Sequence, residues 1–224
     1  MLNVRAITTL LFFVGFLACN FCEAQTVPRG FKSREQYFNA VILPKAQEMA
    51  RQNLSEQVRF KDPESKLLDP SRLVLFTPYR PRIYNVGGGH AGFINGMDVS
   101  IHGVASLSGR RFRVFGNVKA IPPGHFKDLG LVEAGFVVDP ILAAEWDEEV
   151  KGFEDYYYTR ADLNWDGLQH VLAFSIGDTG FILLCWEDMA GLNADRDFED
   201  VIVVLDLGET NVEMIKTPPT DLPH

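Results

Sequence analysis

Short apolar or β-branched runs recur along most of the chain, and Gly, Pro, Asn and Asp separate them. Runs of this length between turn-forming residues are typical of β-strands, whose alternate side chains face opposite sides of a sheet. The pattern predicts seven strands, near residues 73–76, 97–104, 111–118, 131–138, 170–176, 181–186 and 201–207. Seven short strands at this spacing favour an all-β fold, namely an antiparallel β-sandwich that is jelly-roll-like.

One segment before these runs has a helical pattern instead. Ser33 and Gln36 form a capping-box pattern, in which both side chains accept hydrogen bonds from backbone N–H groups of the first turn. Apolar residues then follow at near-helical spacing up to residue 53. We therefore expect one N-terminal α-helix over residues 33–53, bent at Pro44 because proline lacks the N–H that a helix interior needs.

These elements divide the chain into four predicted parts. Residues 1–24 form a signal peptide, 25–69 the N-terminal helix and a polar connector, 70–210 the β-sandwich domain, and 211–224 a flexible tail. The length of 224 residues and the 46% share of hydrophobic residues suit one sizeable core. We therefore expect a single folded domain.

The first 24 residues have the features of an export signal. One positive charge at Arg5 precedes an apolar stretch that ends at Cys19, and the small residue Ala24 stands at the expected cleavage site. This stretch is too short to span a membrane comfortably, so we predict a soluble chain that is secreted, periplasmic or at the cell surface. A lipoprotein acylated at Cys19 is the alternative. Cleavage leaves Cys185 as the single cysteine, in an apolar run that predicts an inert core thiol.

Acidic residues are concentrated in the second half of the chain. Residues 139–206 contain 17 Asp and Glu against three Lys and Arg, whereas residues 1–138 contain 10 acidic and 17 basic residues. The formal net charge of the chain is −9. Such an acidic half attracts cations and repels a phosphate backbone, so we expect no nucleic-acid partner.

Two acidic segments in this half have the composition of calcium loops. Residues 187–200 place six carboxylates in fourteen positions between two apolar runs. Residues 162–167 read Asp-Leu-Asn-Trp-Asp-Gly, with oxygen-bearing side chains at alternate positions and a glycine for the turn. Calcium takes about six to eight oxygen ligands, and a divalent ion would relieve the repulsion between crowded carboxylates.

Residues 162–167 do not begin an EF-hand, because the twelfth position would need a bidentate Glu and the chain has Ala173 there. Any missing ligands would have to come from the second acidic segment, so we expect the two segments to bind calcium together. The predicted ligands are Asp162, Asn164, Asp166, Glu187, Asp188, Asp195, Asp197 and Asp200. The alternative is a pair of solvated acidic turns, in which Asp and Asn bond to their own backbone.

The same residues resemble a known family, catalogued as "domain of unknown function 4114" and found in exported and surface-anchored bacterial proteins. Its first motif is similar to residues 163–171, Leu-Asn-Trp-Asp-Gly-Leu-Gln-His-Val, which follow the aromatic run 156–158. Its second motif is similar to Glu187-Asp188, Gly191 and the Asp-Arg-Asp-Phe-Glu-Asp run at 195–200. The resemblance covers about residues 120–208. It implies an all-β extracellular domain that binds calcium and has no established enzyme activity.

The chain departs from the family pattern at three places. Glu199 replaces an Asn, Gln169 replaces an Asp, and residues 192–194 interrupt the glycines. Glu in place of Asn keeps an oxygen ligand and adds charge. The lost glycines matter for the loop backbone, because glycine reaches positive φ at far lower cost than Leu or Ala.

We therefore predict an exported calcium-binding module with a structural, adhesive or ligand-recognition role, no catalysis, and a surface glycan or a protein as its partner. A carbohydrate-binding module is the alternative, in which Tyr156, Tyr158 and Trp165 stack on sugar rings. A glycoside hydrolase is the third reading. It would use two of Glu145, Glu187, Asp188 and Glu199 as acid and base, with carboxyl groups about 5 to 9.5 Å apart.

Overall fold

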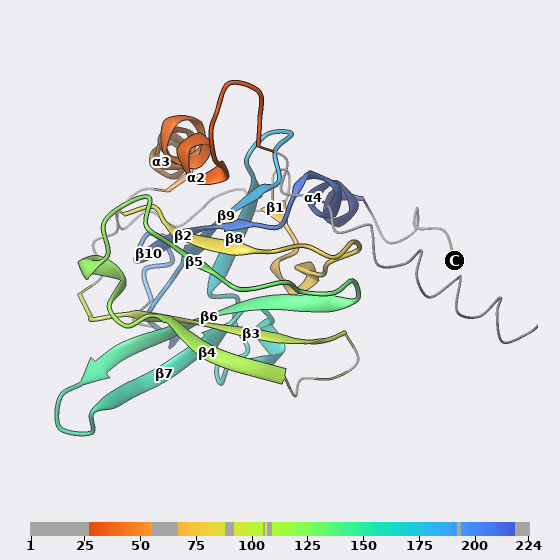
Figure 1. Ribbon diagram of the computed structural model, residues 1–224. Helices are drawn as coiled ribbons and strands as arrows, with labels where there is room; N and C mark the ends of the chain where they lie inside the picture. The colour runs from red at the N-terminus through yellow and green to blue at the C-terminus, as the bar shows by residue number, and fades with distance from the viewer. Residues whose placement is uncertain are drawn as a thin grey trace, which may run out of the picture.

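The fold consists mainly of two antiparallel β-sheets with few helices (Figure 1). The computed structural model describes residues 27–54, 67–87, 92–104, 106, 109–191 and 194–217 of the chain. The predicted signal peptide, Cys19 and most of the polar connector lie outside these residues. Within the described ranges, no helix is both long and apolar enough to cross a membrane.

The larger sheet has six strands in the order β1-β8-β9-β10-β2-β5, and every neighbouring pair is antiparallel. Strands β8, β9 and β10 follow one another along the chain as neighbours. The strands are β1 (Leu67–Leu68), β2 (Arg82–Asn85), β5 (Phe126–Asp128), β8 (Val171–Ser175), β9 (Phe181–Trp186) and β10 (Val201–Asp206).

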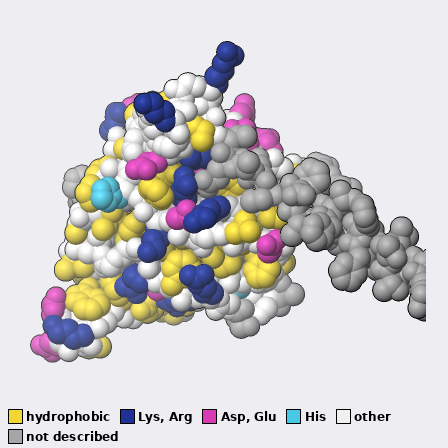
Figure 2. All heavy atoms as spheres, viewed as in Figure 1, with side chains coloured by type: hydrophobic (Ala, Val, Ile, Leu, Met, Phe, Trp, Pro, Cys, Tyr) yellow, Lys and Arg dark blue, Asp and Glu magenta, His cyan; other side chains and the backbone are white. Residues whose placement is uncertain are grey.

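The smaller sheet has four antiparallel strands in the order β4-β3-β6-β7. These are β3 (Gly96–Gly103), β4 (Gly109–Phe115), β6 (Phe136–Asp147) and β7 (Gly152–Tyr158). The hairpin of β6 and β7 projects beyond the rest of the sheet, with acidic and basic side chains at its tip (Figure 2). Short 3₁₀ turns lie outside the sheets: η3 (Pro70–Arg72), η4 (Val118–Ala120) and η5 (Ala161–Leu163).

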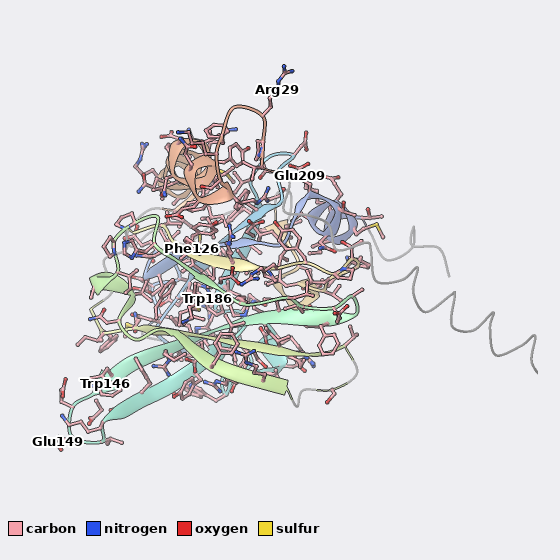
Figure 3. All side chains as sticks on the ribbon, in the orientation of Figure 1. Arg29, Phe126, Trp146, Glu149, Trp186 and Glu209 are labelled. Atoms are coloured by element: carbon pink, nitrogen blue, oxygen red, sulfur yellow. The ribbon has the colours of Figure 1, made fainter. Side chains whose placement is uncertain are left out.

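One hydrophobic core lies between the two sheets. Leu184, Trp186 and Val203 of the six-stranded sheet join Val99 and Leu142 of the four-stranded sheet in this cluster, and all five are fully buried. Figure 3 places Trp186 between the sheets, whereas Trp146 and Glu149 mark the projecting hairpin. The two sheets therefore face each other as the predicted sandwich requires.

The N-terminal helical segment covers the other face of the six-stranded sheet (Figure 1). It consists of α2 (Arg34–Tyr37), the π-helical η2 (Phe38–Ile42) and α3 (Leu43–Asn53). Phe38, Ile42 and Ala46 pack there against Leu183 and Val204. Because β9 and β10 are buried on both faces, they need apolar side chains on both, which explains their continuous apolar runs.

The predicted Ser33 cap is confirmed, but the reciprocal bond of the Gln36 side chain goes to Lys32 and not to the N–H of Ser33. The Ser33 hydroxyl accepts a hydrogen bond from the Gln36 N–H at 3.0 Å, and the Gln36 side chain accepts one from the Lys32 N–H at 2.8 Å. The helix changes its hydrogen-bond register shortly before Pro44, over Phe38–Ile42. The π-helical turn directly precedes α3, which has Pro44 in its first turn, where a missing N–H costs least.

Two strand predictions need correction. Residues 73–76 form only an isolated bridge, between Val74 and Val137, although Leu73 and Leu75 are fully buried. Residues 131–135 precede β6, which begins at Phe136 and continues to Asp147. Strands β1, β2, β5 and β7 were not predicted, because their sequences carry charged residues or are too short to form an apolar run.

The predicted tail begins too early, because residues 209–216 form helix α4 (Glu209–Lys216). Val212 and Ile215 of this helix join the core between the sheets. The Asn211 side chain accepts hydrogen bonds from the N–H groups of Phe76 and Thr77, which fastens the helix to the sandwich. Residues 218–224 lie outside the described part of the chain.

The predicted core thiol is present. Cys185 lies in β9, is fully buried, and burial raises its pKa far above the ordinary value of a thiol. It contacts the core beneath the N-terminal helical segment. A thiol that stays protonated in an apolar core is inert, as the sequence predicted.

Candidate metal centre

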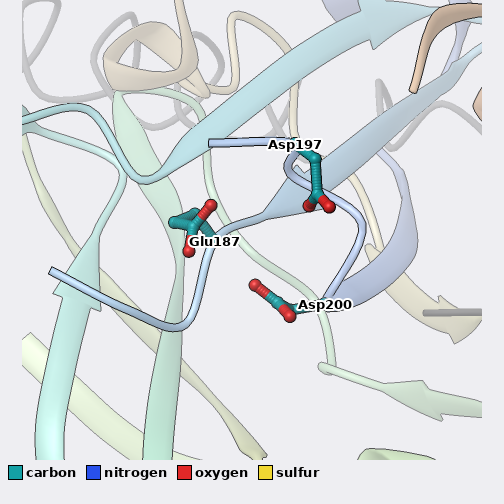
Figure 4. Close-up of side chains that lie close together, drawn as sticks. All are labelled: Glu187, Asp197 and Asp200. Carbon is teal, nitrogen blue, oxygen red and sulfur yellow. The ribbon is translucent and has the colours of Figure 1, made fainter. Parts of the chain in front are cut away.

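Three carboxylates gather in the loop between β9 and β10. Glu187 directly follows β9, and Asp197 and Asp200 lie in the last turn before β10. One carboxylate oxygen from each residue lies within 4.8 Å of the others. Figure 4 shows the three side chains directed toward a common space. Among the described residues this is the one group of three or more His, Cys, Asp or Glu side chains with metal-binding spacing.

The carboxylates are largely buried, and their own loop supplies only part of their hydrogen bonds. Glu187 is 2% exposed, and its Oε1 accepts a bond from the Met189 N–H at 3.3 Å. Its Oε2 is buried and has no hydrogen-bond partner among the described residues. The Asp200 Oδ2 accepts a bond from the Asp188 N–H at 2.9 Å. A buried carboxylate oxygen without a donor is costly, so the contacts of the described residues leave Oε2 of Glu187 unsatisfied.

The backbone holds Asp197 in the cluster by an uncommon conformation. Its neighbours Arg196 and Phe198 both have φ of 58°, in the left-handed region that non-glycine residues rarely enter. Such a residue costs about 1 kcal/mol or more and persists only where surrounding contacts fix it. Phe198 provides one such contact, because its ring is buried against the outer core of the six-stranded sheet. Gly191 takes the same region at φ 68° with no such strain.

Burial and mutual repulsion shift the carboxyl pKa values upward. Burial, with the negative charges of Asp195 and Asp197 next, raises the pKa of Glu187 from 4.5 to about 7. Burial, with the charge of Asp188 next, raises the pKa of Asp200 from 3.8 to about 8. The pKa of Asp188 is also raised, mainly by burial. The metal-free cluster therefore keeps some of its carboxyl groups protonated near neutral pH, because its surroundings stabilise the full negative charge poorly.

Asn95, which sequence reasoning missed, connects this loop to the smaller sheet. It directly precedes β3, and its amide donates a hydrogen bond of 2.6 Å to the Asp188 Oδ2. Its carbonyl oxygen accepts one of 3.2 Å from the Glu145 N–H. Asn95 lies 93 positions before Asp188, and no local sequence pattern marks it. The acidic loop is thus held at one end of the sandwich by both sheets.

The first predicted loop reaches the second through Asp166. The Asp166 carboxylate lies 3.1 Å from Nε2 of His170 and accepts a 3.4 Å bond from the Gly191 N–H. Burial acts against ionisation here, but hydrogen bonds from the Leu168 N–H and from His170 lower the pKa of Asp166. Tyr157 stacks on the His170 ring with centroids 3.9 Å apart. Asp166 therefore supports the second loop rather than joining the three carboxylates.

The other two predicted ligands of that loop have different partners. Asp162 is exposed and pairs with Arg160, whose guanidinium donates bonds of 3.0 and 2.5 Å to it and lowers its pKa. The Asn164 amide is engaged by backbone: its oxygen accepts from the Tyr158 N–H at 2.7 Å, and its nitrogen donates to the Leu168 carbonyl at 2.7 Å. We therefore omit Asp162 and Asn164 from the ligand set proposed below.

The remaining predicted residues occupy three different places. Asp195 is exposed at the rim of the cluster, near enough to raise the pKa of Glu187. Tyr156 and Tyr158 lie on β7, two positions apart and therefore on one face of the smaller sheet. Trp165 is 67% exposed in the turn after η5.

No protein-family model matches this chain, and no curated protein or solved structure is significantly similar to it. The resemblance to the family of domain of unknown function 4114 therefore stays a prediction.

The raised pKa values predict an unusual pH dependence for the metal-free protein. Because the folded state binds a proton at Glu187 more tightly than the unfolded chain, its stability should increase as the pH falls from about 7 toward 4.5. We expect Glu187 to contribute roughly 2 kcal/mol to this increase. Urea unfolding in metal-free buffer between about pH 5 and pH 8 measures it. The Glu187→Gln variant should show a flatter dependence, and equal slopes in the two proteins would contradict the assignment.

Proposed function

We propose that the protein is an exported module that binds calcium through Glu187, Asp197 and Asp200. The bound ion orders the loop between β9 and β10 for a structural, adhesive or ligand-recognition role. When bound, it supplies positive charge and oxygen coordination. Asp188 and Asp195, whose charges act on the same cluster, add negative potential that attracts a cation.

The observation that carries this proposal is the unpartnered Oε2 of Glu187. This oxygen is buried next to two more carboxylates, while the described residues offer it no donor. A solvated acidic turn would point its carboxylates to water instead, as Asp162 does. Burial without a donor is stable only if a cation or a proton compensates the charge, which is why we infer a metal site.

The chemistry of the donors favours calcium over magnesium or zinc. All three side chains offer carboxylate oxygen, and the group contains neither His nor Cys, which zinc prefers. Magnesium keeps most of its waters and uses one or two carboxylates in a near-ideal octahedron. Calcium accepts more oxygen ligands in flexible geometry, so it suits three converging carboxylates with nearby backbone and water oxygens.

Burial of two of the predicted acid and base candidates supports a binding role without catalysis. Glu187 is 2% exposed and Asp188 is 5% exposed, so a sugar ring has no room to reach this pair of carboxylates. A glycoside hydrolase would need both carboxyl groups on the wall of a cleft that admits the substrate. The paired-carboxylate alternative at Glu187 is therefore the weaker proposal.

The scaffold and location that we propose are a jelly-roll-like sandwich at or beyond the cell envelope. In support of the first, the chain moves repeatedly between the sheets: β2 and β5 lie in one, and β3, β4, β6 and β7 in the other. In support of the second, the first 24 residues have the pattern of a signal peptide. A surface glycan or a protein would be the partner of such a module.

Calcium titration by calorimetry tests the proposal directly. We expect metal-free protein to bind calcium with at least tenfold preference over magnesium. Glu187→Gln keeps the side-chain shape but removes the charge, and should weaken binding by about tenfold or more. Glu149→Gln, at the exposed hairpin tip, is the matched control and should bind as the wild type does. Absence of calcium binding by the wild-type protein would disprove the site.

A further inference from the structure

A second site is formed by a pocket on the smaller sheet. The pocket has a volume of about 420 Å³, within the range of roughly 300 to 1,000 Å³ that is usual for small-molecule sites. All four strands of the sheet and η5 contribute to its walls. Its lining includes Ser100, His102, Arg111, Asp139, Ile141, Tyr158 and Leu163.

One wall of the pocket is polar and unusually well buried. Ser100 is opposite Arg111 on one neighbouring strand and opposite Asp139 on the other, so the three residues form a row across the sheet. His102 follows two positions after Ser100 and lies on the same face. Ser100, His102 and Asp139 are 8%, 6% and 4% exposed. Side chains of this kind are buried in proteins only when hydrogen bonds compensate them.

The hydrogen bonds within the protein leave part of this wall unsatisfied. The Thr159 hydroxyl donates to Oδ1 of Asp139 at 2.6 Å, whereas Oδ2 lies 3.9 Å from Nε2 of His102, beyond hydrogen-bonding distance. The Nδ1 of His102 is 3.0 Å from the Gly103 carbonyl, which can only accept. In the tautomer in which Nδ1 donates to that carbonyl, Nε2 accepts, and it then faces a second acceptor in Asp139. Within the described ranges, no hydrogen bond to the Ser100 hydroxyl is seen.

Another part of the pocket lining is apolar. It consists of Ile141, Leu163 and the ring of Tyr158. The Tyr158 hydroxyl is 3.4 Å from Nη1 of Arg111, and the same guanidinium bonds to Asp98 through Nε at 3.0 Å. Tyr158 and Arg111 are therefore held in place, and the pocket lining combines apolar groups with donors and acceptors.

We propose that this pocket binds a neutral sugar residue. Two acceptors 3.9 Å apart suit neighbouring hydroxyl groups, each of which can donate to one acceptor and accept from Ser100 or Arg111. The C–H groups of a sugar ring would contact Ile141, Leu163 and Tyr158. An anion would be repelled by Asp139 and a cation by Arg111, whereas a polyol uses both charges.

The geometry fits binding rather than hydrolysis. Ser100, His102 and Asp139 are the residue types of a catalytic triad, but neither nitrogen of His102 is placed to take a proton from the serine. Nδ1 faces the Gly103 carbonyl, and Nε2 faces Asp139. A triad needs one ring nitrogen on the serine and the other on the carboxylate.

The sugar pocket does not depend on the proposed calcium site. It lies on strands of the smaller sheet, whereas the three carboxylates belong to the loop between β9 and β10 of the larger sheet. The two proposals share none of their ligand-contacting residues. Each can therefore fail without affecting the other.

Saturation-transfer NMR with simple glycosides tests the pocket. The probes are the methyl glycosides of glucose, galactose, mannose and fucose, with glucuronate and glucosamine as charged comparators, each at millimolar concentration. We expect transfer to at least one neutral glycoside. Asp139→Asn should weaken its binding about tenfold, because it removes a charge-assisted acceptor while keeping the shape. Ser100→Phe, which fills the pocket, should abolish it.

Asp155→Asn on β7 is the matched control, since Asp155 lies outside the pocket, and it should bind as the wild type does. Thermal unfolding of each variant establishes that it is folded, and Asp139→Asn decides alone if Ser100→Phe does not fold. The proposal is overturned if no neutral glycoside binds, if only a charged comparator binds, or if both pocket variants bind like wild type. Measuring binding again in EDTA should give the same affinity.

Discussion

Calcium should raise the free energy of unfolding of the metal-free protein by about 2.7 kcal/mol when free ion exceeds Kd a hundredfold. The reason is that Glu187, Asp197 and Asp200 converge only in the folded state, so the unfolded chain offers no comparable site. For a chain of this length, the melting temperature should rise by roughly 5 to 10 °C. Thermal unfolding in EDTA and then in excess calcium measures the rise, which should be larger in more calcium.

The variant Asp197→Asn/Asp200→Asn separates this effect from non-specific salt stabilisation. It keeps the size of both side chains but removes two of the three charges that face the common space. We expect it to melt at the same temperature with and without calcium. In EDTA it should be at least as stable as wild type, because neutralising Asp200 removes a carboxylate whose pKa burial raises to about 8. A full calcium response in this variant would contradict the proposed ligands.

The strands that could be predicted are those whose local pattern already reflects their burial. Strand β9 was predicted with its observed bounds, because the core between the sheets and the N-terminal helical segment bury both its faces. Residues 73–76 were predicted as a strand for the same reason, because Leu73 and Leu75 are core residues. Their backbone does bond to residues 135–138, but the pairing stays an isolated bridge between Val74 and Val137. An apolar pattern reports burial, whereas a strand also needs pairing that continues over several residues.

Strands β5 and β7 could not be predicted from the apolar pattern of the sequence. The three residues of β5 include Lys127 and Asp128 and pair only with β2 at the edge of the sheet. Strand β7 is an edge strand that carries Glu154 and Asp155. Edge strands do not need apolar residues on both faces, so their sequences resemble loops. Their positions follow from pairing with distant strands, which local periodicity does not encode.

The sequence indicated which loop forms the candidate metal centre, but not which of its carboxylates come together. Crowded carboxylates identified the loop, yet which of them point inward depends on the left-handed backbone at Arg196 and Phe198. No composition rule indicates that conformation at two non-glycine residues. The loss of Asp162 from the set could have been foreseen, since Arg160 two positions earlier offers it an ion pair. The contact of Asn95 with Asp188 could not have been foreseen, because only the fold brings the two residues together.

Replacing Arg34 with Met should destabilise the fold by about 3–5 kcal/mol, the usual cost of removing one partner from a buried ion pair. Arg34 lies in α2, is 3% exposed, and donates two hydrogen bonds of 2.7 Å to Asp206 at the end of β10. Asp206 is fully buried, so without the guanidinium its charge would lose its ion-pair partner. The pair also connects the N-terminal helical segment to the sheet. Denaturant unfolding of Arg34→Met measures the loss.

A second substitution tests whether the charge of Asp206, left without its ion-pair partner, is the main cause of the stability lost in Arg34→Met. The Asp206 carboxylate also accepts bonds from the Tyr79 hydroxyl at 3.0 Å and the Gly208 N–H at 3.2 Å. Asn at 206 keeps an oxygen for these donors but carries no charge, so Arg34→Met/Asp206→Asn should recover about half of the lost stability. The exposed pair of Arg51 and Glu48 provides the matched control. Arg51→Met should cost less than about 1 kcal/mol, because water already solvates both charges. If Arg34→Met costs no more than Arg51→Met, the buried pair does not hold the helical segment on the sheet.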